Sequence, residues 1–136
     1  MDLVIDTNIL ISALISSNGK IRELIFSDKF KLFAPEYVFL EIYEHKQEII
    51  KKAELSESEF ELALSVLFTK IIITPSEEIK VFSEKAKQVC PDFDDWPFFA
   101  LAILKNIPLW SDDKDLKQQD VIKVMSTKEI IALFLS

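Results

Sequence analysis

The chain has 136 residues, which is a usual size for one domain and enough to bury a full hydrophobic core. Hydrophobic residues make up 49% and charged residues 29%, which excludes a disordered chain, and charges interrupt every apolar run before it could span a membrane. The net charge of −7 argues against an ordinary nucleic-acid-binding module, unless several acids converge on divalent metal ions. We therefore expect one soluble domain covering residues 1–136.

The first half of the chain alternates short apolar strands with helices. The pattern predicts strands at residues 3–5 and 31–34, and helices at 9–15, 20–27, about 36–52 and from 56 onward. Thr7 or Asn8 is the expected N-cap of the first helix. Ser56, with Glu59 three residues later, matches a capping box at the start of the last of these helices.

The second half continues the alternation. Strands are predicted at residues 70–74, 108–110 and 121–125, and helices at 75–89, 94–105 and from Thr127, the expected cap, to the end. Pro97 falls in the first turn of its helix, where the missing N–H is tolerated. Short strands that are apolar on both faces predict an α/β fold, a three-layer α/β/α sandwich with a central parallel sheet of four to five strands.

Rare residue types exclude several kinds of site. Gly19 is the only glycine, so neither a P-loop nor a glycine-rich dinucleotide fingerprint can form. Cys90 is the only cysteine, which excludes an intrachain disulfide and a thiolate metal cluster; with no evident signal peptide, we expect a cytoplasmic protein. His45 and Cys90 lie in unrelated contexts, so no nucleophilic triad is indicated. Arg22 is the only arginine, so the chain has few side chains suited to recognising the edges of nucleic-acid bases.

Acidic residues follow two of the predicted strands. Asp6 comes directly after the first strand, and Asp112, Asp113 and Asp115 follow the fourth. In open parallel sheets, ligands bind at the carboxyl ends of the strands. The two groups of acids should therefore lie at the same edge of the sheet.

Two predicted helices supply further acids. Glu41 stands between apolar residues, and two interpretations remain open: an ion pair with His45 or Lys46, or a metal ligand. The run from residue 92 to residue 95 contains three aspartates at the start of an apolar helix. Helix capping explains one or two of them, and a metal cradle would explain all three.

Carboxylates are hard oxygen ligands that suit Mg²⁺ or Mn²⁺ better than zinc. Such ions can activate water and offset charge on a phosphoryl oxygen. A calcium loop formed by Asp113, Asp115 and Asp120 is not indicated, because the required glycine and the closing glutamate are absent.

Four segments together resemble the PIN-domain family: Val4 to Asn8 (VIDTN), Glu41 on a helix, Asp95 to Ala102 (DWPFFALA), and Ser111 to Leu116 (SDDKDL). Their order and spacing fit across essentially the whole chain. The resemblance implies the α/β/α sandwich, a ribonuclease site that uses Mg²⁺ or Mn²⁺, and RNA as substrate. It also points to the toxin component of a toxin–antitoxin pair, and hence to an antitoxin protein as partner.

The resemblance assigns roles residue by residue. The implied catalytic acids and metal ligands are Asp6, Glu41, Asp95 and Asp113, with Asp115 as a supporting ligand, while Thr7, Asn8 and Ser111 brace the site. Relatives more often carry glycine or another residue at position 112, so the choice between Asp112 and Asp113 stays open, as does that between Asp94 and Asp95. Lys20, Lys46, Lys114 and Lys117 are candidates for contacts with RNA phosphates, or are ordinary solvated surface.

Other features of the sequence bear on two alternative functions and on self-association. A catalytically inactive PIN-like module that binds a partner protein is the alternative, favoured by the acidic balance and the scarce arginine. A receiver module is disfavoured, because the third strand has no acid after it until Glu77. The sequence has 11 phenylalanines, and Phe30, Phe60, Phe68 and Phe82 either fill the core or mark a homodimer interface. Separately, the segment from Tyr37 to Phe68 is predicted as two helices that could form a clamp or a dimer arm.

Overall fold

A computed structural model describes residues 1–16 and 19–135 and contains a five-stranded, wholly parallel sheet. The strands are β1 (Asp2–Ile5), β2 (Lys31–Pro35), β3 (Ile71–Thr74), β4 (Leu109–Trp110) and β5 (Val124–Met125), and their order is β3-β2-β1-β4-β5. The predicted fold class is confirmed. The strand order reverses direction between β1 and β4, which is where parallel sheets of this kind place their ligands.

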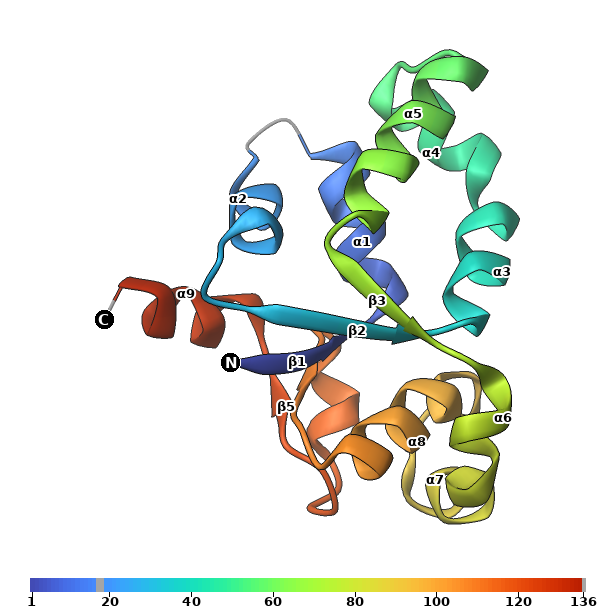
Figure 1. Cartoon of the computed structure of the whole chain (residues 1–136), viewed down its shortest axis with the longest axis vertical. Coiled ribbons are helices and arrows are strands. Elements are labelled where there is room, and N and C mark those ends of the chain that lie inside the picture. The colour runs from blue at the N-terminus through green and yellow to red at the C-terminus, as the bar shows by residue number, and fades with distance from the viewer. Residues whose placement is uncertain (17–18, 136) are drawn as a thin grey trace.

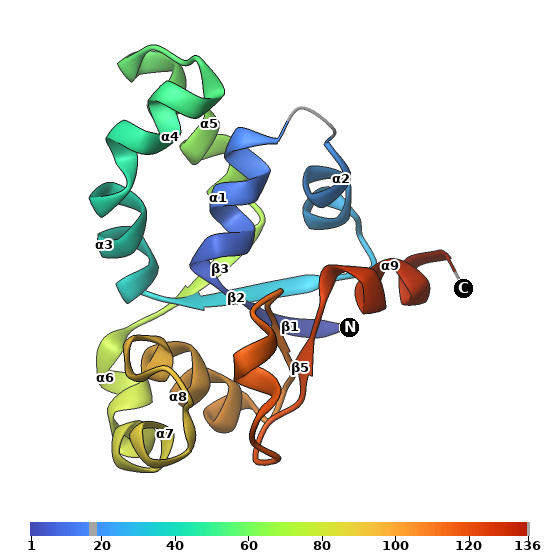
Figure 2. The ribbon, with the colours of Figure 1, turned by 180° about the vertical axis from the view of Figure 1, so that it is seen from behind.

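Helices cover both faces of the sheet (Figure 1). One face carries α1 (Thr7–Ile15), α2 (Lys20–Phe26), α3 (Tyr37–Glu44), α4 (Lys46–Ala53) and α5 (Glu57–Phe68). The other carries α6 (Ser76–Ile79), η1 (Lys80–Phe82), α7 (Ser83–Val89), η2 (Phe93–Asp95) and α8 (Trp96–Lys105). The view from behind shows the same two layers, with α9 (Thr127–Leu135) near α2 (Figure 2).

The central strand explains why both faces must be apolar. Val4 of β1 lies opposite Phe33 of β2 on one side and Leu109 of β4 on the other. Leu3, Val4 and Ile5 are all fully buried, because helices pack above and below them. Such a strand reads as a continuous hydrophobic run instead of an alternating one.

Several predicted boundaries are wrong. The helix expected at 36–52 breaks at His45 into α3 and α4, the helix expected at 75–89 is interrupted by η1, and α8 begins at Trp96 instead of Asp94. Ile42 and Ile49 lie on either side of the first break, and both are fully buried. Because they are seven residues apart, the hydrophobic period runs on through the break and gives no sign of it.

The phenylalanines named as interface candidates belong to the core. Phe30 and Phe60 are 8% and 0% exposed, and Phe68 and Phe82 pack partly buried against the same cluster. The segment between residues 37 and 68 contains three helices, where two were expected. These phenylalanines therefore do not mark an exposed dimer interface, and that interpretation is wrong. The homodimer itself stays a prediction. None of the described helices combines the length and the apolar character needed to cross a membrane.

Candidate metal centre

Asp6 lies where β1 ends and α1 begins, and it is 5% exposed. Its Oδ1 accepts a 2.9 Å hydrogen bond from the backbone N–H of Ile9, which makes Asp6 the N-cap of α1. The sequence prediction of Thr7 or Asn8 as the cap is therefore wrong by one or two residues. A capping carboxylate satisfies an otherwise unpaired amide, so folding the helix also fixes the position of the acid.

Burial raises the pKa of Asp6 to about 6, chiefly because the charged form loses its hydration. Hydrogen bonds from the Ser111 side chain and the Ile9 backbone lower the pKa, while the charges of Asp112 and Glu41 raise it further. No cationic group is among these causes. A buried carboxylate whose charge is left uncompensated by the protein is a favourable place for a cation.

Glu41 projects from α3 and is tied to α1. The Thr7 hydroxyl donates a 2.6 Å hydrogen bond to Glu41 Oε1. The ion pair left open by the sequence does not form, because His45 and Lys46 pair instead with other glutamates, on α4 and α5. Burial is the main cause that raises the pKa of Glu41.

A cluster of three aspartates lies beside these two acids. Asp92, Asp95 and Asp113 each offer a carboxylate oxygen, and the three oxygens lie within 4.8 Å of one another. The pKa of Asp95 is raised to about 7, first by burial and then by the charges of Asp92, Asp6, Glu41 and Asp113. The charges of the other three predicted ligands, Asp6, Glu41 and Asp113, therefore all act on the Asp95 carboxylate.

Asp92 was predicted only as one of three aspartates in a candidate metal cradle, and the family resemblance gave it no role. Its carboxylate accepts a 3.1 Å hydrogen bond from the backbone N–H of Asp94, and this turn places it beside Asp95. The bunching of aspartates was visible in the sequence, but the turn that selects Asp92 and Asp95 was not. Asp94 is exposed and does not belong to the cluster.

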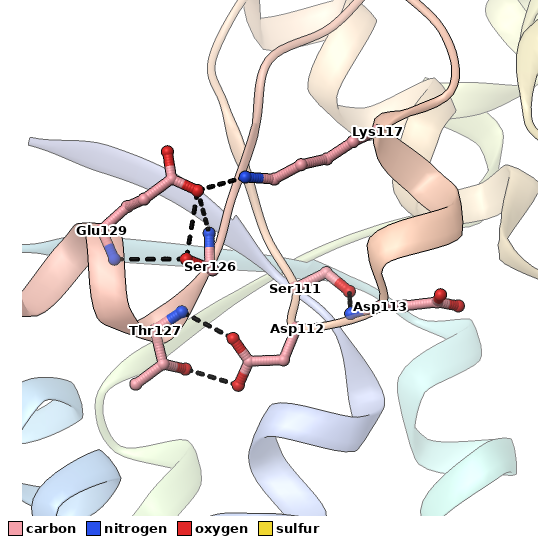
Figure 3. Close-up of polar contacts among 7 residues, drawn as sticks. All are labelled: Ser111, Asp112, Asp113, Lys117, Ser126, Thr127 and Glu129. Carbon is pink, nitrogen blue, oxygen red and sulfur yellow. Dashed lines mark hydrogen bonds and ion pairs between the residues drawn. The ribbon is translucent and has the colours of Figure 1, made fainter.

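The loop after β4 separates two adjacent aspartates, as Figure 3 shows. Asp112 turns toward α9, where its two oxygens accept hydrogen bonds from the Thr127 backbone N–H at 2.6 Å and the Thr127 hydroxyl at 2.7 Å. Asp113 points the other way, and its N–H donates to Ser111 Oγ at 3.1 Å. The structure thus places Asp113 in the carboxylate cluster and gives Asp112 a structural partner.

The remaining predicted residues are placed unevenly. Ser111 and Thr7 are buried at 1% and 5% exposure beside Asp6 and Glu41, in positions that suit the predicted bracing. Asn8 is exposed. Asp115 is also exposed and lies outside the cluster, with its Oδ1 3.4 Å from the side-chain nitrogen of Gln118.

Three of the four candidate phosphate-binding lysines are engaged elsewhere. Lys20 lies 3.8 Å from Glu23, Lys46 pairs with glutamates of α5, and Lys117 pairs with Glu129 of α9. Lys114 is exposed and follows Asp113 directly. These contacts favour the surface interpretation for Lys20, Lys46 and Lys117.

The chemistry of the site suits a hard divalent cation. All its donors are carboxylate oxygens, which Mg²⁺ and Mn²⁺ accept. Burial, and after it the neighbouring negative charges, raises the pKa values of Asp6 and Asp95, and a bound dication would relieve the repulsion between those charges. Cys90 offers no competing nucleophile, because burial raises the pKa of its thiol to about 12.

Comparisons with known proteins bear on the family and on the fold. The family model of the PIN domain matches residues 4–132. The fold is similar to that in the "Crystal structure of VapBC2 from Rickettsia felis bound to a DNA fragment from their promoter", with a TM-score of 0.68 and 16% sequence identity over 93% of this chain and 98% of that chain. No curated protein matches the sequence.

Proposed function

This chain belongs to the PIN-domain family, and from that premise we propose that it is an endoribonuclease that hydrolyses RNA phosphodiester bonds with Mg²⁺ or Mn²⁺. One observation carries the proposal. The carboxylate oxygens of Asp92, Asp95 and Asp113 lie within 4.8 Å of one another, and the charges of Asp6 and Glu41 also act on Asp95. Bringing carboxylates together in this way costs free energy in the absence of a cation, so a purely structural role would not explain the arrangement.

We assign roles to the residues by their positions. Asp6, Glu41, Asp95 and Asp113 are the proposed catalytic metal ligands, and Asp92 is an additional candidate because it belongs to the cluster. A divalent cation bound there would activate a water molecule and offset the negative charge that grows on the phosphoryl oxygens. Thr7 and Ser111 hold the Glu41 and Asp6 carboxylates in place through their hydroxyl groups.

We also propose that the protein acts as the toxin of a toxin–antitoxin pair, with an antitoxin protein as partner. The support is the fold, which it shares with the VapBC2 structure from Rickettsia felis, crystallised with a DNA fragment from its promoter. Co-expression with the product of a neighbouring reading frame, followed by co-purification, tests this assignment. A protein that neither binds such a product nor slows growth when expressed alone would contradict it.

Cleavage of a mixed RNA pool tests the nuclease assignment. The wild-type protein is expected to cleave RNA with Mn²⁺ or Mg²⁺ and to lose the activity in a chelator. Asp6→Asn should lower the cleavage rate by at least about a hundredfold, since even residues that only support metal ligands can matter that much. Asparagine is as good an N-cap as aspartate, so α1 should stay intact.

The matched control is Asp120→Asn, which removes the same charge from an exposed residue outside the cluster. It should cleave as the wild type does, and circular dichroism should show all three proteins folded. Cleavage by Asp6→Asn at the wild-type rate would contradict the assignment. The alternative of an inactive module that binds a protein predicts no saturable Mn²⁺ binding by the wild type, which calorimetry measures directly.

A further inference from the structure

A pocket of about 520 Å³ opens between α3, α6, η1, α7 and the start of α8. The residues important here are Tyr37, Lys80, Lys87, Trp96 and Pro97. This volume falls in the range of pockets that bind small organic groups. None of these five residues has a role in the proposed metal centre.

The pocket adjoins the carboxylate cluster. Trp96 directly follows Asp95 in the chain, and Tyr37 begins α3 two residues after β2 ends. The Tyr37 pKa is raised by burial and by the charges of Glu41, Glu44, Asp94 and Asp95, so the phenol lies in the field of the site. Figure 1 shows α3 on one side of this edge of the sheet and α6 with α8 on the other.

The walls of the pocket combine aromatic rings with positive charge. Trp96 and Tyr37 are partly exposed, and Lys87 Nζ lies 4.7 Å from the centre of the Trp96 ring. Within residues 1–16 and 19–135, neither Lys80 nor Lys87 forms an ion pair with a carboxylate. Glu77 is the one acid among the residues that line the pocket.

Lys80 and Lys87 lack a carboxylate partner among the described residues, and Lys87 also lies over the Trp96 and Phe93 rings, so their charge is available to an anionic ligand. The whole chain has a net charge of −7, whereas the residues that line this pocket include two lysines and one glutamate, so the local charge of the pocket is positive. Aromatic faces beside lysines are the combination by which proteins bind single-stranded nucleic acid, with bases stacked on the rings and phosphates held by the cations.

We propose that this pocket binds one nucleobase of single-stranded RNA next to the phosphate that is cleaved. The base stacks against Trp96 and Tyr37, and Lys87 and Lys80 contact the adjoining phosphate. This inference rests on the proposed nuclease function and adds to it a base-binding site at this pocket. Stacking accepts any base, so the pocket selects single strands over duplexes more than it selects a sequence.

The two tryptophans make binding visible. Trp110 is fully buried, and its Nε1 donates to the Thr127 hydroxyl, so it is shielded from a ligand. A change in tryptophan fluorescence on adding RNA therefore reports on Trp96. The titration uses the Asp6→Asn protein with Mg²⁺, so that cleavage does not interfere, and the probes are the pentaribonucleotides A5 and U5.

We expect saturable quenching by both pentamers and none by a pentamer of abasic nucleotides. In the same background, Trp96→Leu should weaken binding of fluorescein-labelled A5 by about tenfold or more, as the loss of one stacked base implies. Lys87→Ala should also weaken binding. Lys85→Ala is the matched control, because Lys85 lies on the same helix but lines a different hollow and should bind as the parent does.

The outcomes separate this inference from the nuclease assignment. Quenching by A5 in a protein that never cleaves RNA would support the pocket and contradict the nuclease function. Normal cleavage by Lys87→Ala and Trp96→Leu, with unchanged KM and no quenching in the titration, would overturn the pocket alone. Equal quenching by the abasic pentamer would also overturn it, since it would show a phosphate site without a base. If Trp96→Leu does not fold, Lys87→Ala decides the question.

Discussion

The Thr7 hydroxyl ties α1 to α3 by donating a 2.6 Å hydrogen bond to the Glu41 carboxylate. Thr7→Val keeps the shape of the side chain but removes the donor, so Glu41 loses its orientation. We expect the affinity for Mn²⁺ to fall by about 10- to 100-fold, the usual effect of losing a partner of a metal ligand. Calorimetric titration with Mn²⁺ measures it.

Thr7→Ser is the control, because serine keeps the hydroxyl. It should bind Mn²⁺ nearly as tightly as the wild type does. If Thr7→Val and Thr7→Ser bound the ion equally well, the hydrogen bond would have no part in holding the site.

The pKa values of Asp6 and Asp95, raised to about 6 and about 7, predict how stability depends on pH without metal. A carboxyl whose pKa is higher in the folded state binds its proton more tightly when folded, so the free energy of unfolding decreases as pH rises from about 4 to about 7. For Asp6 the shift from 3.8 is worth on the order of 3 kcal/mol. Asp92, Glu41 and Asp113 face Asp95 and add to the repulsion.

Urea unfolding in a chelator, at pH values between about 5 and 8, measures this dependence. The Asp95→Asn protein should show a flatter profile and be more stable than the wild type at the upper end, because it removes one of the repelling charges. A wild-type protein whose stability rises steadily over this range would show that the acids are not crowded.

At the scale of elements, the contacts of α9 hold the loop that carries Asp113 (Figure 3). Ser126 and Glu129 form reciprocal hydrogen bonds at 3.2 Å, Glu129 N–H to Ser126 Oγ and Ser126 N–H to Glu129 Oε1. Ser126, and not Thr127 as predicted, therefore supplies the capping hydroxyl. Lys117 of the loop pairs with the same glutamate and lowers its pKa to about 2, with Ser126 contributing.

Glu129→Gln tests this connection. Glutamine can still complete the capping box, so the change removes mainly the charge pair with Lys117. We expect a loss of about 0.3–1 kcal/mol in the free energy of unfolding near neutral pH, since the pair is partly exposed. Because the pKa of Glu129 is lower in the folded protein than in the unfolded chain, its charge stabilises the fold above the unfolded pKa, and that contribution is lost as pH falls toward 2. The difference in stability between Glu129→Gln and the wild type should therefore shrink below about pH 4. Urea titrations near neutral pH and below about pH 4 measure this difference in stability. A difference that does not depend on pH would indicate that the substitution acts through side-chain packing and not through charge.

Local patterns in the sequence predicted whole elements well and their junctions poorly. The capping box of Ser56 and Glu59 is present as predicted, because both partners lie within one turn. The break at His45 was missed because the apolar period continues through it. Asp113 could be told from Asp112 only once Thr127 was placed, and that contact joins residues 15 apart. Long-range contacts of this kind leave no periodic signal in one sequence.

At the scale of the whole molecule, the crowded acids should make a divalent cation a strong stabiliser of the fold. A ligand that binds only the folded state, at a hundred times its Kd, adds about 2.7 kcal/mol. For a chain of this size, that corresponds to a rise in Tm of about 5–10 °C. We therefore expect Mn²⁺ to raise the Tm of the metal-free protein by that amount, and NaCl of equal ionic strength to raise it much less, because Asp6 is buried and bulk salt screens a buried charge poorly.

Differential scanning fluorimetry of three proteins decides between site binding and general screening. Asp120→Asn, outside the cluster, should respond to Mn²⁺ as the wild type does, while Asp95→Asn should respond far less, because it removes the carboxylate on which the other acids act. An equal response from all three would mean that the ion stabilises the molecule by reducing its net charge of −7. In that case, the carboxylates at the sheet edge would not form a metal centre, even though they lie close together.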